Sequence, residues 1–206
     1  MNKINVMIAD DHAIVRIGLS ALIESRNSFT LVGQAEDGES AVRMALRRHP
    51  DVIVMDLMMP QKDGIEATRE IKAKAPEVKV LILTTSSVSD DIARALENGA
   101  DGAITKSTTN TELLGAIQAV AEGKRYISSE IRELLAQDPP APKLSDRQLE
   151  ILGLVVKGFT TADISRMIGI REGSIKEHVN IICDKLGAAN RTEACAIALK
   201  KNLITR

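Results

Sequence analysis

Aromatic residues are scarce in this sequence of 206 residues, which contains one Tyr, two Phe and no Trp. So few rings leave little surface for stacking on carbohydrates or on unpaired bases. Long apolar runs are missing too, since none approaches the roughly 20 residues of a membrane-spanning helix. The first nine residues also lack the basic start and the cleavage site of a secretory signal. We therefore expect a cytoplasmic protein with no membrane partner.

Cysteine is nearly absent as well, because the sequence has only Cys183 and Cys195, with His178 as the one histidine near them. Without CxxC spacing there are too few ligands for a structural zinc site. We expect both thiols to pack as small apolar side chains, and we assign neither a role as a nucleophile.

Net charge is small, −1 at neutral pH, but it is unevenly distributed. Residues 143–206 contain 11 Lys and Arg against 7 Asp and Glu, a net of +4, which leaves −5 for the rest. An acidic first part suits a metal ion or a basic surface, and a mildly basic last part suits phosphates. The chain length suits two domains, one of roughly 100 to 150 residues and one of roughly 60.

The first 122 residues alternate short apolar runs with amphipathic segments, which is the pattern of a parallel sheet covered by helices. The apolar runs are mostly aliphatic or β-branched and lie at 4–9, 29–35, 52–55, 78–84 and 102–105. Apolar residues recur every three or four positions in the segments 13–24, 40–48, 65–74, 91–97 and 111–122, as they do in helices. We therefore predict an α/β fold over residues 1–122, a doubly wound (βα)5 parallel sheet.

The pattern lapses at residues 123–143, which contain a short helical stretch near 129–135 and then three prolines in four positions. Such a run predicts a stiff, extended linker. Residues 144–206 show only helical patterns, at 145–156, 161–168, 173–186 and 191–200. We therefore predict that an all-α, four-helix domain occupies residues 144–206.

Polar side chains stand at the ends of four predicted strands: Asp10 and Asp11, Asp56, Thr84, and Lys106. The carboxyl ends of parallel strands meet at one edge of a sheet. Crowded carboxylates need a cation, and Mg²⁺ accepts hard oxygen ligands while leaving positions open for phosphate oxygens. This set supports phosphoryl transfer to Asp56, with Mg²⁺ and Lys106 balancing the charge. Capping of the following helices is the alternative for any one of these residues, but it does not explain all five.

These motifs closely resemble the receiver domain of bacterial two-component response regulators, through Asp10 and Asp11, the run 54–60 with Gly64, Thr84 and Lys106. The resemblance implies a sensor histidine kinase as the partner that phosphorylates Asp56. It also implies further roles: Asp11, Asp56 and the backbone carbonyl of Met58 as Mg²⁺ ligands, Asp10 as a supporting carboxylate, Lys106 as phosphate partner and Thr84 as switch hydroxyl.

Ala103 departs from the receiver pattern, because receivers commonly carry Tyr or Phe three residues before the lysine. That ring acts as a rotating partner of the switch threonine, so the coupling cannot operate in this chain.

Residues 160–178 have the pattern of a helix, a Gly-containing turn and a second helix. Thr160 or Thr161 can cap the first helix, and Ser174 lies at the start of the second. A second helix held across the first can enter a major groove, which places Lys176 to reach DNA. Asn180, one turn further on, could hydrogen-bond an adenine edge. An ordinary helical hairpin with a solvated charged face would show the same spacing.

The wider motifs look like the LuxR-type helix-turn-helix; they lie at 144–152, 163–165, 174–178, 185–187 and 190–194. Together with the first domain, the chain resembles the NarL/FixJ subfamily of response regulators. The resemblance implies a regulator that is not an enzyme, binds double-stranded DNA and forms a homodimer when phosphorylated, with residues 192–200 pairing the monomers. The expected DNA contacts are Ser174, Lys176, Glu177, Asn180, Lys185 and Arg191. Two residues depart from the family pattern: Gln148, where the family usually has Glu, and the acidic Glu177.

Other classes of protein fit less well. Aspartyl-phosphate hydrolases need a second Asp two residues after the first, where this chain has Met58, and no glycine-rich loop for a nucleotide is present. The remaining alternative is a regulator of the same fold that acts through protein contacts or ligand binding and has lost phosphorylation or DNA binding. Ala103 and Glu177 motivate this alternative.

Overall fold

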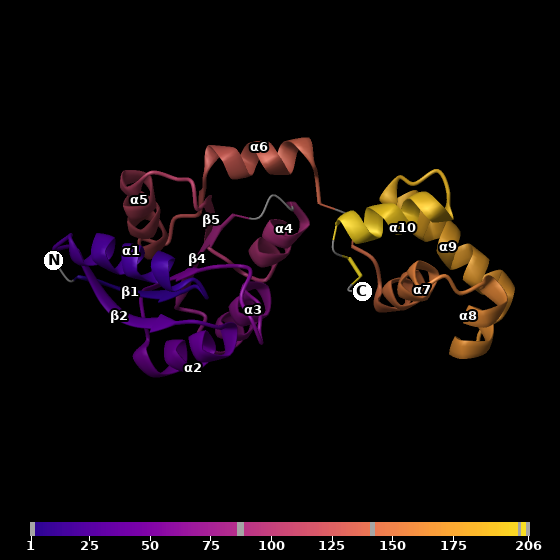
Figure 1. Cartoon of the computed structure of the whole chain (residues 1–206), viewed down its shortest axis with the longest axis horizontal. Helices are drawn as coiled ribbons and strands as arrows, with labels where there is room; N and C mark the ends of the chain where they lie inside the picture. Colours follow the sequence, from indigo (N-terminus) through magenta and orange to yellow (C-terminus); the bar gives the residue numbers. More distant parts are fainter. Residues whose placement is uncertain (1–2, 86–88, 141–142, 202, 205–206) are drawn as a thin grey trace. The chain divides into compact units, whose positions relative to one another are not determined.

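The computed structural model of the chain describes all residues except 1–2, 86–88, 141–142, 202 and 205–206. The chain divides into two compact units, Met1–Asp138 and Pro139–Arg206 (Figure 1). Among the described residues, no helix has the length and apolar character required to span a membrane. Part of the predicted proline-rich connector, at 141–142, lies outside the described residues.

The first unit alternates strands and helices: β1 Ile4–Ala9, α1 Ala13–Glu24, β2 Phe29–Ala35, α2 Gly38–Arg48, β3 Val52–Met55, α3 Gly64–Lys74, β4 Lys79–Thr84, α4 Ser89–Glu97, β5 Gly102–Thr105 and α5 Asn110–Ala121. The strands pair in parallel in the order β2-β1-β3-β4-β5-β6, where β6 is Tyr126–Ile127. The order steps outward in both directions from β1, so the prediction of a doubly wound parallel sheet is confirmed.

Alternate side chains of each strand enter different apolar cores on the two faces of the sheet. In β1, Val6 and Ile8 pack with α1 and α5, whereas Met7 and Ala9 pack with α2, α3 and α4. Figure 1 shows these two helical layers on either side of the strands. Because both faces are covered, the strands read as continuous apolar runs rather than as alternating ones.

The first unit extends beyond the predicted domain end at residue 122. Strand β6 pairs with β5, and the helix α6, Ser129–Gln137, buries Ile131 in the core shared with α2, α3 and α4. The predicted division into residues 1–122, 123–143 and 144–206 therefore places in the linker a strand and a helix that pack as part of the first unit.

Gly64 lets α3 begin directly against the loop that follows β3. A Cβ atom at this position would lie 2.0 Å from the carbonyl oxygen of Asp56, so a larger residue would force the loop apart. The Gly64 amide donates to the Leu57 carbonyl over 2.9 Å, and the side chain of Asp63 caps the helix. These contacts fix the backbone around Asp56.

The second unit contains only helices among its described residues: α7 Asp146–Val156, α8 Thr161–Ile168, α9 Glu172–Leu186 and α10 Arg191–Lys200. Capping boxes begin α7 at Ser145 and α8 at Thr160, and Gly169 ends α8 in the left-handed conformation. Cys183 and Cys195 are partly buried against the apolar core, and burial raises the pKa of each thiol. The predicted all-α domain and the packing role of the cysteines are confirmed.

Candidate functional site

The ends of three strands bring two acids and a lysine together in the first unit. The amide of Asp56 donates to Ala9 O over 2.8 Å, and the amide of Lys106 donates to Thr84 O over 2.9 Å, so each residue continues the ladder beyond its strand. Asp10 follows β1 directly, and the side chains of Asp10 and Asp56 are 2% and 3% exposed. The sequence therefore buries two carboxylates side by side at the carboxyl edge of the sheet.

Lys106 lies between the two buried carboxylates. Its Nζ is 2.6 Å from Asp10 Oδ2 and 2.7 Å from Asp56 Oδ2. Burial raises the pKa of Asp56 above its ordinary value, even though the hydrogen bond from Lys106 acts in the opposite direction. Burial alone would lower the pKa of Lys106, but its bonds to Asp10 and Asp56 outweigh this and raise it. The lysine therefore remains a cation at neutral pH.

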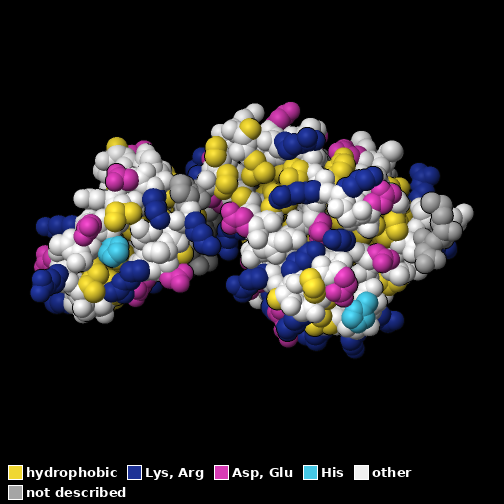
Figure 2. All heavy atoms as spheres, turned by 180° about the vertical axis from the view of Figure 1, so that it is seen from behind, with side chains coloured by type: hydrophobic (Ala, Val, Ile, Leu, Met, Phe, Trp, Pro, Cys, Tyr) yellow, Lys and Arg dark blue, Asp and Glu magenta, His cyan; other side chains and the backbone are white. Residues whose placement is uncertain are grey.

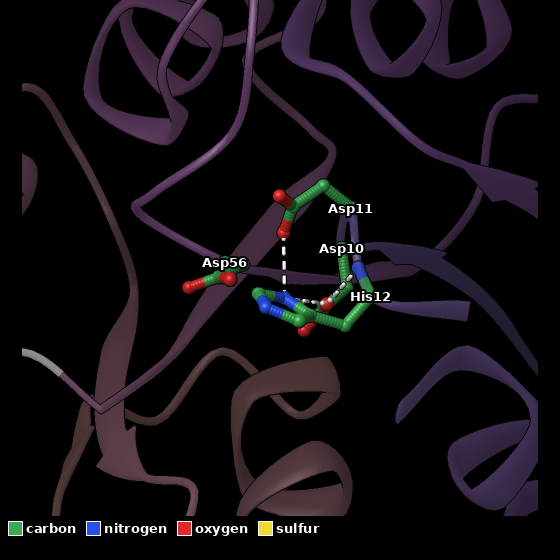
Figure 3. A group of neighbouring side chains, drawn as sticks. All are labelled: Asp10, Asp11, His12 and Asp56. Atoms are coloured by element: carbon green, nitrogen blue, oxygen red, sulfur yellow. Dashed lines mark hydrogen bonds and ion pairs between the residues drawn. The ribbon is translucent and has the colours of Figure 1, made fainter. Parts of the chain in front are cut away.

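Asp11 and His12 complete the cluster on its exposed side (Figure 3). One ligand atom each from Asp10, Asp11, His12 and Asp56 can be chosen so that all four lie within 4.8 Å of one another. The sequence motifs indicated the three acids, but nothing in them indicated His12. One lysine against three carboxylates leaves an excess of two negative charges, which matches a single divalent cation. The donor atoms present therefore fit the binding of such an ion.

Thr84 and Met58 flank the cluster. Thr84 ends β4 and is completely buried, whereas the side chain of Met58 is 62% exposed. The amide of Met58 lies 3.4 Å from Asp56 Oδ1, which brings its backbone beside the acid. The roles of the Met58 carbonyl as a ligand and of Thr84 as a switch stay predictions.

Ala103 is completely buried in the core that also contains Ile131 of α6. Its carbonyl accepts a hydrogen bond from the amide of Ser128 over 3.0 Å. The residue that replaces the usual aromatic side chain therefore contacts the segment leading into α6.

Helix α9 presents most of the predicted DNA contacts on one face. Three of these residues are exposed: Lys176 and its neighbour Glu177, and Asn180 about one turn further along the helix. Ser174 is partly buried near the start of the helix. Ile175 and Ile182 are buried against the core on the other side of the helix. The predicted reading face is thus free of the packing that holds the helix.

Lys185 and Arg191 instead make contacts within the second unit. Lys185 Nζ donates to the carbonyl of Lys143 and to Gln148 Oε1, each over 3.0 Å. Arg191 donates to the carbonyl of Phe159. Both side chains therefore help to hold the domain together, which the sequence pattern did not indicate.

Basic and acidic side chains are interspersed over the second unit on the face that Figure 2 shows. The net charge of +4 over residues 143–206 is accordingly spread rather than gathered on that face. On this face, close contacts of a few side chains rather than a broad basic surface would supply any affinity for phosphates.

Comparisons with known proteins identify both domains. The response regulator receiver domain matches residues 6–118, and the luxR family of bacterial regulatory proteins matches residues 142–198. The transcriptional regulatory protein YdfI of Bacillus subtilis is 35% identical over 213 residues, covering 100% of this chain and 99% of YdfI.

Two solved structures are similar over the whole chain. The response regulator ChrA of a heme-sensing two-component system has 36% identity and a TM-score of 0.60, covering 99% of this chain and 100% of ChrA. RcsB of Salmonella enterica serovar Typhimurium, bound to promoter P1flhDC with the phosphomimetic BeF3⁻, has 26% identity and a TM-score of 0.72, covering 97% and 99%. The chain therefore belongs to the response regulators that join a receiver domain to a luxR-type helix-turn-helix domain.

Proposed function

We propose that a sensor histidine kinase phosphorylates this transcriptional regulator on Asp56 in the cytoplasm, and that phosphorylation controls its binding to DNA. The position of Asp56 carries the proposal. It is a buried carboxylate at the end of β3; Lys106 Nζ donates to its Oδ2, and the Met58 amide lies 3.4 Å from its Oδ1. One carboxylate oxygen is thus available as a nucleophile while a cation balances the other.

The residues around Asp56 suit an in-line attack on a phosphoryl group. An oxygen of Asp56 forms the new bond to phosphorus, the bond to the leaving group of the donor breaks, and an aspartyl phosphate results. Lys106 donates hydrogen bonds to the transferred oxygens, and Asp11, Asp56 and the Met58 carbonyl would hold Mg²⁺, with Asp10 supporting them. When bound, Mg²⁺ neutralises charge on the phosphoryl oxygens. The hydroxyl of Thr84 then acts as the switch group that responds to the phosphorylation of Asp56.

The second unit supplies the output. Helix α9 enters the major groove of double-stranded DNA and reads it through Lys176, Glu177 and Asn180, with Ser174 at its start. The similarity to RcsB, which was solved bound to promoter P1flhDC, supports DNA binding as the output. Phosphorylation promotes a homodimer through α10, and the dimer occupies two half-sites about one helical turn apart.

Intact-mass measurement after treatment with acetyl phosphate and Mg²⁺ tests the phosphorylation step. We expect one added phosphoryl group on the full-length chain and none on Asp56→Asn. Asp63→Asn is the matched control, because Asn caps a helix as well as Asp does and Asp63 lies at the start of α3. An adduct that persists in Asp56→Asn would overturn the assignment.

Sedimentation with and without beryllofluoride tests the output step. We expect a larger species and tighter DNA binding once the phosphate mimic occupies the site. An unchanged monomer with unchanged DNA affinity would instead favour a regulator that acts through protein contacts. Ala103 and the internal contacts of Lys185 and Arg191 are the observations that favour this second candidate.

A further inference from the structure

His12 occupies an unusual place beside the acidic cluster. It is the N-terminal cap residue of α1, yet its side chain makes no capping hydrogen bond. Its amide instead donates to Asp10 Oδ1 over 2.8 Å, and Nδ1 lies 2.7 Å from Asp11 Oδ1 and 3.3 Å from Asp10 Oδ1. Figure 3 shows the imidazole ring turned toward the carboxylates. A nitrogen donor therefore belongs to the same group as the acids.

The separations suit one shared ion. Bonds of about 2.1 Å in an octahedral site place neighbouring ligand atoms about 3 Å apart. The two distances from His12 Nδ1, 2.7 and 3.3 Å, lie on either side of that value. The imidazole and Asp11 Oδ1 can thus occupy adjacent positions around a cation with little movement, and Asp10 Oδ1 lies close enough to support them.

Lys106 determines which oxygens remain for that ion. Its Nζ takes Oδ2 of Asp10 and Oδ2 of Asp56, so Oδ1 of Asp10 is the atom that faces His12. The side chain of His12 is 66% exposed, which leaves the imidazole free to adjust when an ion enters from solvent. Lys106 therefore neutralises Oδ2 of Asp10 and Oδ2 of Asp56. The donor atoms on the exposed side of the cluster include one nitrogen, Nδ1 of His12.

We propose that His12 is a ligand of the divalent cation at this site and shifts its preference from Mg²⁺ toward first-row transition-metal ions such as Mn²⁺. Imidazole is a good ligand for transition metals, whereas Mg²⁺ favours oxygen donors and gives up water reluctantly. This inference rests on the proposed function, because it concerns the same cation site.

Pulsed electron paramagnetic resonance of Mn²⁺ bound to the full-length chain tests the proposal. We expect modulation from a directly bound imidazole nitrogen in the wild type and its loss in His12→Ala and His12→Asn. Asn at the cap position preserves the start of α1, so the second variant guards against a local folding defect. His49→Asn is the control, since His49 lies at the end of α2 in a left-handed conformation that Asn tolerates.

Competition titrations of Mn²⁺ against Mg²⁺ provide a second readout. His12→Ala should weaken Mn²⁺ binding by about tenfold or more, because losing even an outer-shell partner of a metal ligand costs that much, and should leave Mg²⁺ binding nearly unchanged. Absence of nitrogen modulation in the wild type, or equal losses for the two ions, would overturn the proposal. Labelling of Asp56 by acetyl phosphate with Mg²⁺ is scored separately, so its failure would count against the proposed function and not against His12 as a ligand.

Discussion

Ser89 donates a hydrogen bond from Oγ to Oδ2 of Asp138 over 2.9 Å, which ties the start of α4 to the end of α6. Ser89 is completely buried, and Asp138 is the last residue of the first compact unit. Thr84, the predicted switch residue, ends the strand that leads into α4. The bond therefore links α4 to the residue that precedes the second unit, and it needs no aromatic side chain at position 103.

Ser89→Ala should loosen the end of α6. The change removes a hydrogen bond to a carboxylate, which stabilises a fold by roughly 1.5 to 3 kcal/mol. Hydrogen exchange of the full-length chain should then show faster exchange over Leu134 to Asp138. Ser20→Ala is the control, because its hydroxyl bonds only within α1. Equal protection of α6 in both variants would contradict a role for the Ser89 bond.

Asp56→Asn should raise the free energy of unfolding at neutral pH in the absence of divalent ions. The pKa of Asp56 is raised in the folded chain, chiefly by burial. Its contribution to stability is therefore complete below the unfolded pKa and is lost as pH rises through the folded pKa. The ionised carboxylate opposes folding at neutral pH, and Asn removes that charge.

Urea unfolding of both proteins at neutral and acidic pH measures this effect. The difference in free energy of unfolding between Asp56→Asn and the wild type should shrink as the solution is acidified, because protonation neutralises Asp56 in the wild type as well. A difference that stays constant, or grows in acid, would show that charge burial is not the cause.

Gln148→Glu should stabilise the second unit. Gln148 is 6% exposed, and its Oε1 accepts hydrogen bonds from the Ser145 amide and from Lys185 Nζ, each over 3.0 Å. A carboxylate accepts the same bonds and makes the one from Lys185 charge-assisted, which is worth about 0.5 to 1 kcal/mol at such a partly exposed pair. Unfolding of the second unit by urea gives the change in free energy.

Gln148→Glu in a Lys185→Met background separates the effect of the ion pair with Lys185 from the effect of burying a carboxylate at position 148. Without the lysine, a buried carboxylate has lost its counter-ion, so Glu at position 148 should destabilise the domain. An identical gain in both backgrounds would mean that Lys185 is not the partner.

The main elements were predictable because their signals are local. The predicted strand at 52–55 and helix at 161–168 coincide with β3 and α8, since an aliphatic run and a capped amphipathic stretch depend on neighbouring residues. Asp10, Asp56 and Lys106 were found because parallel strands end at one edge whatever their order. The geometry at Lys106 follows from this topology.

The remaining features depend on contacts between distant residues. Strand β6 has only two residues and exists through its pairing with β5, so it has no periodicity to detect. The contact of Lys185 with Gln148 joins α9 to α7 across 37 positions of the sequence. Such side-chain contacts are set by tertiary packing rather than by spacing in the sequence.

Lys176 and Glu177 lie next to each other on the exposed face of α9, and neither side chain has an ion pair or hydrogen bond within the part of the chain that the structure describes. Lys176→Ala should weaken DNA binding and flatten its dependence on salt, because each phosphate contact contributes a slope of roughly 0.9. Lys157→Ala, an exposed lysine at the end of α7, is the control. Titrations of cognate and scrambled duplexes at several salt concentrations measure both quantities.

Glu177→Gln distinguishes two positions of the carboxylate in the groove. If Glu177 faces the phosphate backbone, removing its charge should strengthen binding to cognate and scrambled duplexes alike, because the repulsion disappears. If it accepts a hydrogen bond from a cytosine amino group, the change should weaken the cognate site by roughly 1 to 3 kcal/mol and relax specificity there. Both results place α9 in the groove. If neither Glu177→Gln nor Lys176→Ala changes DNA binding, a different element reads the DNA.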